Sequence, residues 1–311
     1  MCNFFKPDVN FVYTKSERLK EESQMKRIGF VGVGVMGASM IRNLMKAGFE
    51  VHIYTRTKSK AEDVIQAGAT WYDTPQALAP HVDVLITMVG YPTDVEQLYL
   101  AEDGFLTTLR SGAFAIDMTT SSPNLAKQMA DEGKAAGIAV LDAPVSGGDI
   151  GAKNGTLTIM VGGDEQDFAA VEPVLKAMGQ SVILQGEPGA GQHTKMVNQI
   201  AIASNMIGVT EAIVYAKKAG LDPEKVLASI SGGAAGSWSL SNLIPRVLKD
   251  DYSPGFFIKH FIKDMRIALD EAKQMGLELP GLAMAEQMYQ QLAESGLADN
   301  GTQALIKYYE K

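Results

Sequence analysis

Short apolar segments alternate with helical segments through the first part of the chain. Lys26–Val33 is an apolar run that ends in glycines, and the residues after it repeat apolar side chains with a helical period as far as Gly48. Further apolar runs of strand length lie at residues 50–55, 84–89, 113–118 and 138–141, with helical stretches between them. Strands that alternate with helices predict right-handed crossovers and a parallel, doubly wound sheet. We expect two more strands, over 156–161 and 181–184, on either side of a helix.

The pattern changes after Pro188. Residues 192–219 form one long helical segment rich in Ile, Ala, Met and Val, and Asp222-Pro223 is typical of the cap and first turn of another helix. Four more helical segments are expected, at residues 239–249, 259–275, 281–293 and 302–309. No strand is expected after about residue 190. The pattern therefore predicts an α/β domain over residues 25–188 and an all-helical domain over 189–311, which the long helix joins.

Residues 1–24 fit neither domain. They combine Met-Cys-Asn-Phe-Phe-Lys-Pro with a charged stretch, and they contain no apolar segment of signal-peptide length. We expect them to be a disordered extension, or the product of an upstream start codon with Met25 as the functional first residue.

Composition narrows the range of partners. The chain has 311 residues, 46% of them hydrophobic, which suits two domains with a sizeable core. Its net charge of −8 and pI near 5.1 argue against nucleic acid or an anionic membrane surface as a partner. In the bare sequence we find no apolar run of the roughly 18 residues that span a bilayer. The predicted ligand is therefore a small molecule.

Cysteine and histidine are sparse. Cys2 is the only cysteine, so no intrachain disulfide can form, and a reducing, cytoplasmic location is expected. The four histidines are scattered and show no zinc-binding spacing, so no metal site is predicted.

A glycine motif stands where the first strand ends and the first helix begins. Gly32, Gly34 and Gly37 form G-x-G-x-x-G, with Val35 and Met36 between the last two glycines. The first glycine permits a tight turn, the second lets the backbone approach a pyrophosphate, and the third allows close packing of helix on strand. The helix start supplies amide donors. The motif alone is often only a glycine-rich turn, but its position favours a dinucleotide site of the Rossmann type.

The residues after the second strand distinguish the two nicotinamide dinucleotides. An NAD site usually has an acidic residue there, about 20 residues beyond the glycines, for the ribose 2′-hydroxyl. This chain has Thr55, Arg56 and Thr57, followed by Lys60, and no carboxylate. Arg56 can fork onto a 2′-phosphate, to which Thr57 and Lys60 would add a hydroxyl and a charge. NADP(H) is therefore favoured, NAD(H) remains possible, and the alternative is an ordinary solvated basic loop.

Lys195 lies in the first turns of the long helix. Asn198 and Gln199 follow at i+3 and i+4, so the three share one helical face. Carbonyl reduction needs a proton donor beside the developing alkoxide, which an ammonium group can supply. Burial and a cationic nicotinamide would lower the lysine pKa, so that it acts as a base in the reverse direction. A helical lysine is more often a solvated surface group, and the spacing alone leaves its role open.

The segment Asp-Ala-Pro-Val-Ser-Gly-Gly follows a predicted strand, at the edge where open α/β sheets bind ligands. Ser146 offers a hydroxyl, and Gly147 and Gly148 expose amides that suit a carboxylate, although a plain turn is equally consistent with the pattern. Residues 151–163 contain an Asn-Gly turn before a strand, which we interpret as scaffold. Lys263 opens a helical run that by itself is typical of a solvated face.

Four segments together resemble the β-hydroxyacid dehydrogenase family, which includes 3-hydroxyisobutyrate dehydrogenases and tartronate semialdehyde, glyoxylate and succinic semialdehyde reductases. They are GFVGVGVMGASMIRNLMKAG, DAPVSGG with GTLTIMVGG, GAGQHTKMVNQ, and FIKDMRIALDEAK. The resemblance covers nearly all of residues 25–311. It departs in the 24-residue extension, and in Gln199, where some members carry a second asparagine, which leaves the substrate open.

The resemblance implies a role for each matching residue. Lys195 would be the general acid/base, with Asn198 and Gln199 orienting substrate and the Ser-Gly-Gly at 146–148 holding its carboxylate. Residues expected at the cofactor, besides those above, are Met88, Val89, Thr120 and Lys263. The resemblance also implies a homodimer or homotetramer whose helical domain completes the site.

The expected function is NADP(H)-dependent interconversion of a small β-hydroxyacid and its semialdehyde, or reduction of a small oxo acid or aldehyde. An imine reductase on the same fold is a second hypothesis, although those relatives commonly carry Asp or Tyr where Lys195 stands. A third is a dinucleotide-binding scaffold without turnover, against which the intact lysine–asparagine face argues.

Overall fold

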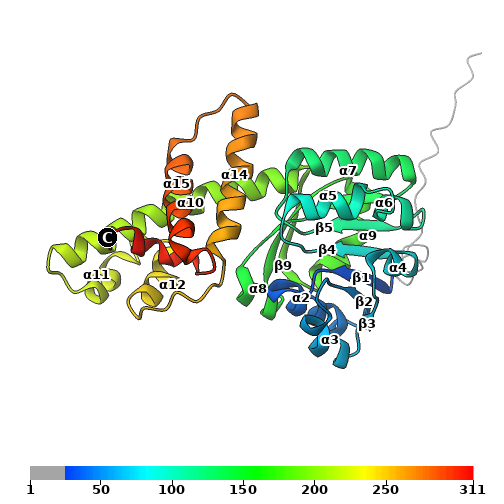
Figure 1. Ribbon diagram of the computed structural model, residues 1–311, viewed down its shortest axis with the longest axis horizontal. Helices are drawn as coiled ribbons and strands as arrows, with labels where there is room; N and C mark the ends of the chain where they lie inside the picture. The colour runs from blue at the N-terminus through cyan, green and yellow to red at the C-terminus, as the bar shows by residue number, and fades with distance from the viewer. Residues whose placement is uncertain (1–24, 311) are drawn as a thin grey trace, which may run out of the picture.

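The computed structural model describes residues 25–310, and the expectation for residues 1–24 lies outside them. Two parts are visible in Figure 1, a sheet covered by helices and a purely helical part. The long helix α10 (Ala190–Lys218) runs from one to the other. The predicted fold class, a Rossmann-type α/β sheet followed by a helical region, is confirmed.

A nine-stranded sheet forms the first part. Its order is β3-β2-β1-β4-β5-β6-β8-β7, with β9 paired to β8. Strands β3 to β6 are parallel, whereas β8 runs antiparallel to β6 and β7 and parallel to β9. The strands are β1 (Arg27–Val31), β2 (Glu50–Tyr54), β3 (Thr70–Trp71), β4 (Val84–Thr87), β5 (Phe114–Asp117), β6 (Ala139–Asp142), β7 (Val145–Ser146), β8 (Leu157–Gly162) and β9 (Gly179–Gly186).

Both faces of the central strands are buried because successive side chains point to opposite faces. Phe30 belongs to a core with helix α2, whereas its neighbour Val31 belongs to a second core with α5, α6 and α7. Ile86 and Leu85 divide in the same way on β4. The helices of this part are α2 (Val35–Lys46), α3 (Glu62–Gln66), α4 (Pro75–Leu78), α5 (Pro92–Leu100), α6 (Phe105–Thr108), α7 (Pro123–Ala136), α8 (Gly148–Asn154) and α9 (Glu165–Lys176). Two 3-10 turns, η1 (Lys58–Ala61) and η2 (Ala79–His81), complete it.

A separate apolar core holds the helical part together. Met206 and Ile213 of α10 lie in it with Phe261 and Tyr289, and the Tyr289 hydroxyl donates to the Thr302 carbonyl oxygen over 2.8 Å. The elements here, besides α10, are α11 (Pro223–Ile230), α12 (Trp238–Asn242), α13 (Ile244–Val247), α14 (Ile258–Gln274), α15 (Pro280–Leu292), a π-helical turn η3 (Ala293–Leu297) and a 3-10 helix η4 (Thr302–Tyr308).

One expectation about secondary structure was wrong. Residues 239–249 form two short helices instead of one, because Pro245 has no amide hydrogen to continue the first helix. The helical segment expected at 302–309 is present as a 3-10 helix over 302–308. Helix α8, after Ser146, was not predicted, since its glycines hide any apolar period.

Helix α10 has the length and composition of a membrane span, with a mean hydropathy of 1.2 over an 18-residue window of which 33% is buried. A core helix passes the same test, and α10 does pack on β8, α14 and α15. Its exposed apolar residues include Val197 and Tyr215.

Candidate active site

The glycine turn lies at the carboxyl end of β1, between β2 and β4. Gly32 has φ +108°, and a Cβ there would overlap the Met88 carbonyl oxygen. A Cβ on Gly37 would overlap the Gly32 carbonyl oxygen. Gly34, by contrast, faces open space. Two of the glycines are therefore required by close packing of β1, β4 and α2, and the third leaves an uncovered approach to the backbone.

Helix α2 begins at Val35, so Gly37 lies inside its first turn. That turn contains no acidic residue, and no side chain caps it. Its amides and the positive end of its dipole therefore face the open side of Gly34 without a competing anion, as a pyrophosphate site requires.

The residues expected at the 2′-phosphate follow β2. Thr55 is half-buried, whereas Arg56, Thr57 and Lys60 are exposed, Lys60 within the 3-10 turn η1. Arg56 Nη1 lies 3.4 Å from Oδ1 of Asp94, in the first turn of α5. The exposed basic loop therefore reaches an acidic residue on the far side of β1.

The loops after β4 and β5 lie next to each other because these strands are paired. The Val89 amide donates to Thr119 Oγ1 over 3.0 Å, and Met88 is also half-buried. Thr120, the next residue, presents its carbonyl oxygen to Nζ of Lys263 at 2.7 Å. Three of the residues expected near the nicotinamide, with Lys263, are thus brought together at the edge where the sheet order reverses.

Lys195 is buried next to β7, at the same edge of the sheet. Its side chain is 7% exposed, and Nζ donates to the carbonyl oxygen of Val145 over 2.8 Å. Burial lowers the pKa of Lys195 to about 8, with a further lowering from the Lys263 charge, while the Asp264 carboxylate opposes both. The expected depression of the lysine pKa is present before any cationic cofactor is considered.

Asp264 connects Lys263 to the polar face of α10, and its charge acts on Lys195. Its Oδ1 lies 2.9 Å from Lys263 Nζ, and its Oδ2 accepts from Gln199 Nε2 over 2.7 Å. The Gln199 Oε1 atom in turn accepts from Asn198 Nδ2, also over 2.7 Å. Gln199 is 2% exposed, and both ends of its amide bind inside the protein. Of the two residues expected to orient substrate, only Asn198 is partly exposed.

The expected carboxylate-binding segment follows the acceptor of Lys195 directly. Ser146 ends β7 and is half-buried, while Gly147 and Gly148 have φ values of +124° and +62° and are exposed. These left-handed conformations, which suit glycine, turn the chain into α8. The segment therefore lies one residue from the Lys195 ammonium contact and contains two exposed glycines.

Sequence reasoning missed the residues that fix the start of α10. Asp142 accepts the amides of Gly189 and Gln192 on its two oxygens, each over 2.7 Å, and burial raises the pKa of this carboxyl. The Gln192 side chain then donates to the Thr119 carbonyl oxygen over 2.7 Å and accepts the Ser121 amide over 2.9 Å. The strand-end aspartate before the glycine-rich helix start was the available signal.

A second buried carboxylate lies on the neighbouring strand. Asp117 Oδ1 accepts from Thr87 Oγ1 at 2.8 Å and from the Thr119 amide at 3.1 Å. Oδ2 has no hydrogen-bond partner within the part of the chain that the structure describes. Burial raises the pKa of Asp117 to about 6, and the nearby Asp142 charge adds to the rise. Asp117 thus supports the loop that carries Thr119 and Thr120.

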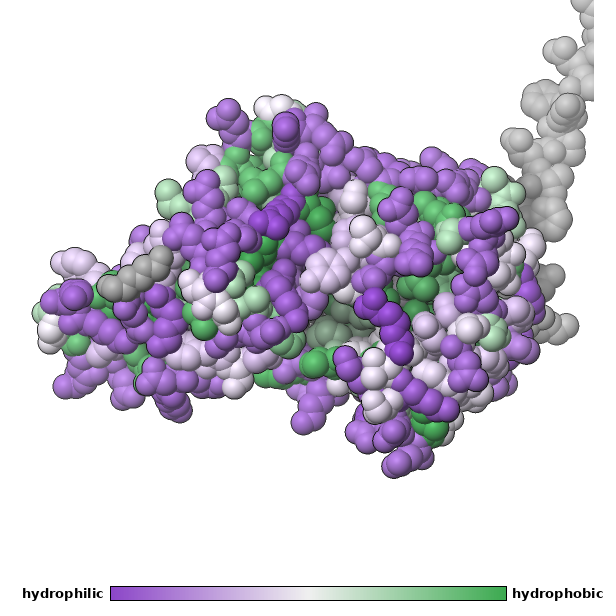
Figure 2. All heavy atoms as spheres, viewed as in Figure 1, coloured by the Kyte–Doolittle hydropathy of each residue, from purple (hydrophilic) through white to green (hydrophobic). Residues whose placement is uncertain are grey.

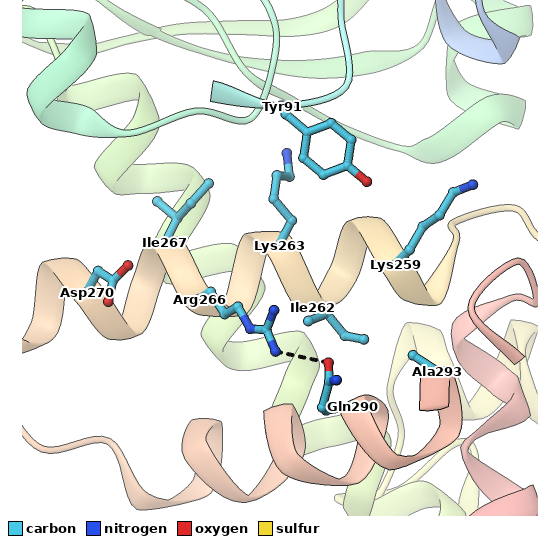
Figure 3. A pocket seen from close by; sticks show the side chains of 9 residues that line it. All are labelled: Tyr91, Lys259, Ile262, Lys263, Arg266, Ile267, Asp270, Gln290 and Ala293. Carbon is cyan, nitrogen blue, oxygen red and sulfur yellow. Dashed lines mark hydrogen bonds between the residues drawn. The ribbon is translucent and has the colours of Figure 1, made fainter. Parts of the chain in front are cut away.

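A pocket of about 420 Å³ opens beside Lys263. In Figure 3, Lys263 points from α14 toward the loop after β4, where the Tyr91 ring lies beside it, and Arg266 binds Gln290. Figure 2 shows the surface hollowed between the two parts, with hydrophobic and weakly polar residues inside and mostly hydrophilic residues outside. The lining residues are Tyr91, Lys259, Ile262, Lys263, Arg266, Ile267, Asp270, Gln290 and Ala293.

Metal ligands do not gather at this edge. Within residues 25–310, no three histidine, cysteine, aspartate or glutamate side chains form a group that could hold a metal ion. The donors that do converge are amides, two lysines and hydroxyls, which suit anionic and carbonyl oxygens.

Comparisons with known proteins match both parts of the chain. Residues 27–186 match the family model described as the NAD binding domain of 6-phosphogluconate dehydrogenase. Residues 189–309 match the model described as the NAD-binding of NADP-dependent 3-hydroxyisobutyrate dehydrogenase. The two models together cover almost all of the described residues.

Individual proteins agree with these models. The chain is 56% identical to the oxidoreductase YkwC of Bacillus subtilis (strain 168), over 92% of this chain and 99% of that protein. It is 37% identical to the 2-hydroxy-3-oxopropionate reductase of Escherichia coli (strain K12), over 91% and 97%. The structure of a Mycobacterium tuberculosis 3-hydroxyisobutyrate dehydrogenase with L-serine matches with a TM-score of 0.85 and 31% identity, over 93% of this chain and 100% of that one.

Proposed function

Because the chain belongs to the β-hydroxyacid dehydrogenase family, we propose that it interconverts a small β-hydroxyacid and its semialdehyde with NADP(H), or reduces a related small oxo acid or aldehyde. Its class is that of the NAD(P)-dependent dehydrogenases and reductases that act on CH–OH groups. The observation that carries the proposal is the buried Lys195, whose Nζ lies 2.8 Å from the Val145 carbonyl oxygen, next to the Ser146-Gly147-Gly148 segment.

Lys195 would move the proton. A carbonyl oxygen that takes up hydride becomes basic, and an ammonium group within hydrogen-bond reach can protonate it. With a pKa of about 8, Lys195 is mainly protonated at pH 7. The deprotonated fraction can accept the hydroxyl proton in the oxidative direction. The Val145 carbonyl oxygen fixes the ammonium group without neutralising it.

The Ser146 hydroxyl and the amides of Gly147 and Gly148 would hold the substrate carboxylate. They are neutral donors, so they bind an anion without adding a positive charge that would lower the Lys195 pKa further. Asn198, partly exposed on the same face of α10 as Lys195, would contact the remaining polar group of the substrate.

The glycine turn and the start of α2 would hold the cofactor, because Gly34 leaves its backbone approachable and the first turn of α2 is free of acidic residues. When bound, the nicotinamide supplies or accepts the hydride. Arg56, Thr57 and Lys60 favour the 2′-phosphate of NADP(H) over NAD(H). Met88, Val89 and Thr120 would contact the nicotinamide and its ribose, with Lys263 closing the site from α14.

A homodimer or homotetramer is part of the proposal. Val197 and Tyr215 on α10 are 66% and 75% exposed, and an apolar helix face of this kind is stabilised when a second subunit covers it. Light scattering coupled to size-exclusion chromatography tests this, and a monomer across the micromolar range would contradict it. We further propose a cytoplasmic location.

One panel tests the function. NADPH and NADH oxidation would be followed with glyoxylate, succinic semialdehyde, tartronate semialdehyde, methylmalonate semialdehyde and a cyclic imine. The proposal expects turnover with at least one of the carboxylated carbonyl compounds and a preference for NADPH. Turnover with the imine alone would favour an imine reductase, and binding of NADPH without any oxidation would favour a non-catalytic scaffold.

A further inference from the structure

The Arg56–Asp94 ion pair lies across the end of β1. Arg56 follows β2, and Asp94 lies in the first turn of α5, which follows β4. Since β2 and β4 flank β1 in the sheet, the pair spans the carboxyl end of β1, where the glycine turn begins. The adenosine half of a dinucleotide on a Rossmann sheet has to occupy this region.

The two partners differ in how firmly they are held. The Asp94 side chain is 23% exposed, and its Oδ2 accepts the Tyr91 amide over 3.1 Å. Its other oxygen, Oδ1, lies 3.4 Å from Arg56 Nη1. The Arg56 side chain is 80% exposed. Asp94 is therefore the anchored partner, and the arginine is the group that can change position when another anion arrives.

We propose that Asp94 reduces the preference of the chain for NADP(H) over NAD(H), by competing with the 2′-phosphate of NADP(H) for Arg56. This inference rests on the proposed function, and it adds a residue that the loop after β2 does not contain. A 2′-phosphate has to take Arg56 from the Asp94 carboxylate, and two anions that approach the same guanidinium group repel each other. Asp94 thus weakens NADP(H) binding.

The same carboxylate affects NAD(H) differently. An acidic residue at this edge can accept a hydrogen bond from a free ribose 2′-hydroxyl, and the loop at 55–60 contains no carboxylate for this purpose. Asp94 therefore reduces the preference for NADP(H) in two ways, by weakening the binding of NADP(H) and by strengthening that of NAD(H). The chain retains measurable binding of NAD(H).

Asp94→Asn is the sharpest variant, because asparagine keeps an acceptor for the Tyr91 amide and loses only the charge. Dissociation constants for NADPH and NADH would be measured by fluorescence titration of the full chain. We expect the NADPH constant to fall about two- to fivefold, the range of an exposed ion pair, while the NADH constant stays the same or rises. An equal change for both cofactors, or no change, would overturn the inference.

Two controls separate competition from a general charge effect. Glu96→Gln removes the same charge from an exposed position of the same helix, and it should leave the ratio of the two constants unchanged. In an Arg56→Gln background there is no arginine to compete for. Asp94→Asn should therefore improve NADPH binding less than it does in the wild type, and only by the repulsion that it removes between Asp94 and the 2′-phosphate. A full gain there, or an equal gain from Glu96→Gln, would show that Asp94 does not act through Arg56.

Failure of the proposed function gives a different result. A wild-type chain that binds neither dinucleotide would remove the cofactor site and this inference together. A wild-type chain that binds both, with Asp94→Asn indistinguishable from it, would remove this inference alone.

Discussion

At the end of the sheet edge formed by β2, β1 and β4, Arg56 and Asp94 are paired at 3.4 Å, and the arginine is 80% exposed. At the other end, next to β7 and the loop after β5, Lys195 is 7% exposed and Asp264 is 1% exposed. Lys263 lies beside them and donates to the Thr120 carbonyl oxygen in that loop. Water and salt screen the first group of charges, whereas the second group acts in a low-dielectric interior. The exposed end can exchange partners with a ligand, and the buried end can hold a perturbed pKa.

The comparison explains why similar residue types serve different purposes. An exposed pair contributes little to stability, but it is readily replaced by an incoming phosphate. A buried ammonium group is costly to the fold, yet it is the one with a pKa close to neutrality. Changes at the buried end should therefore act on turnover, and changes at the exposed end on cofactor binding.

Lys195→Met should give the largest effect. Loss of the proton donor is expected to lower kcat about 10²–10⁴-fold, while the dissociation constant for NADPH changes far less. Stopped-flow and steady-state rates would measure turnover, and titration would measure binding. Lys153→Met, an exposed lysine on α8, is the matched control and should retain activity. Near-wild-type turnover in Lys195→Met would refute the acid/base assignment.

The stability of the same variant provides an independent check. The folded pKa of Lys195 is lowered from 10.5 to about 8, so burying its charge opposes folding below about pH 8, and this cost diminishes as the pH rises toward 10.5. Lys195→Met removes the charge. Its free energy of unfolding at pH 7, from urea titration, should be no lower than that of the wild type, in spite of its lost activity.

Arg56→Gln should give the next largest effect, at the exposed end. Loss of charge-assisted hydrogen bonds to a 2′-phosphate is worth about 1.5–3 kcal/mol, or roughly 10- to 150-fold in the NADPH-to-NADH preference. The ratio of kcat/KM for the two cofactors measures it. The maximal rate with saturating cofactor should change little. A preference that does not move would mean that another group reads the 2′-phosphate.

Asp264→Asn should give a smaller effect and act on the pH dependence. The Asp264 carboxylate raises the pKa of Lys195, so its replacement should move that pKa further down. The pH at which oxidation reaches half its maximal rate should then fall below the wild-type value. Thermal unfolding would be recorded in parallel, because Gln199 loses a charged partner. A rise in the pH at which oxidation reaches half its maximal rate would contradict the assigned effect of Asp264 on the Lys195 pKa.

Much of the fold could be predicted from the sequence, because period-2 and helical patterns are local. The parallel strands β1, β2, β4, β5 and β6 and the long helix α10 follow from such patterns. The strands β3 and β7 were not predicted, since two residues are too few to show a period, and the glycines of α8 obscure the helical period there. The break at Pro245 was predictable in principle from its missing amide hydrogen.

The site was predictable one residue at a time, and its connections were not. Lys195 and Lys263 were singled out from separate motifs, but the effect of the Lys263 and Asp264 charges on Lys195 depends on how α10 and α14 pack. Gln199 was expected to face substrate, whereas tertiary packing uses its amide for Asp264 and Asn198. Gln192 and Asp142 were missed, because an aspartate at a strand end does not reveal which helix start it binds 50 residues further along the chain.

The pH dependence of hydroxyacid oxidation tests the central claim most directly. Oxidation needs the neutral amine of Lys195, so its rate should rise with pH through a midpoint near the pKa of about 8, and the rate of reduction should fall through the same range. Lys195→Met should retain only a residual rate without this transition. A wild-type rate that does not change between about pH 6 and 10, or the same transition in Lys195→Met, would contradict the account.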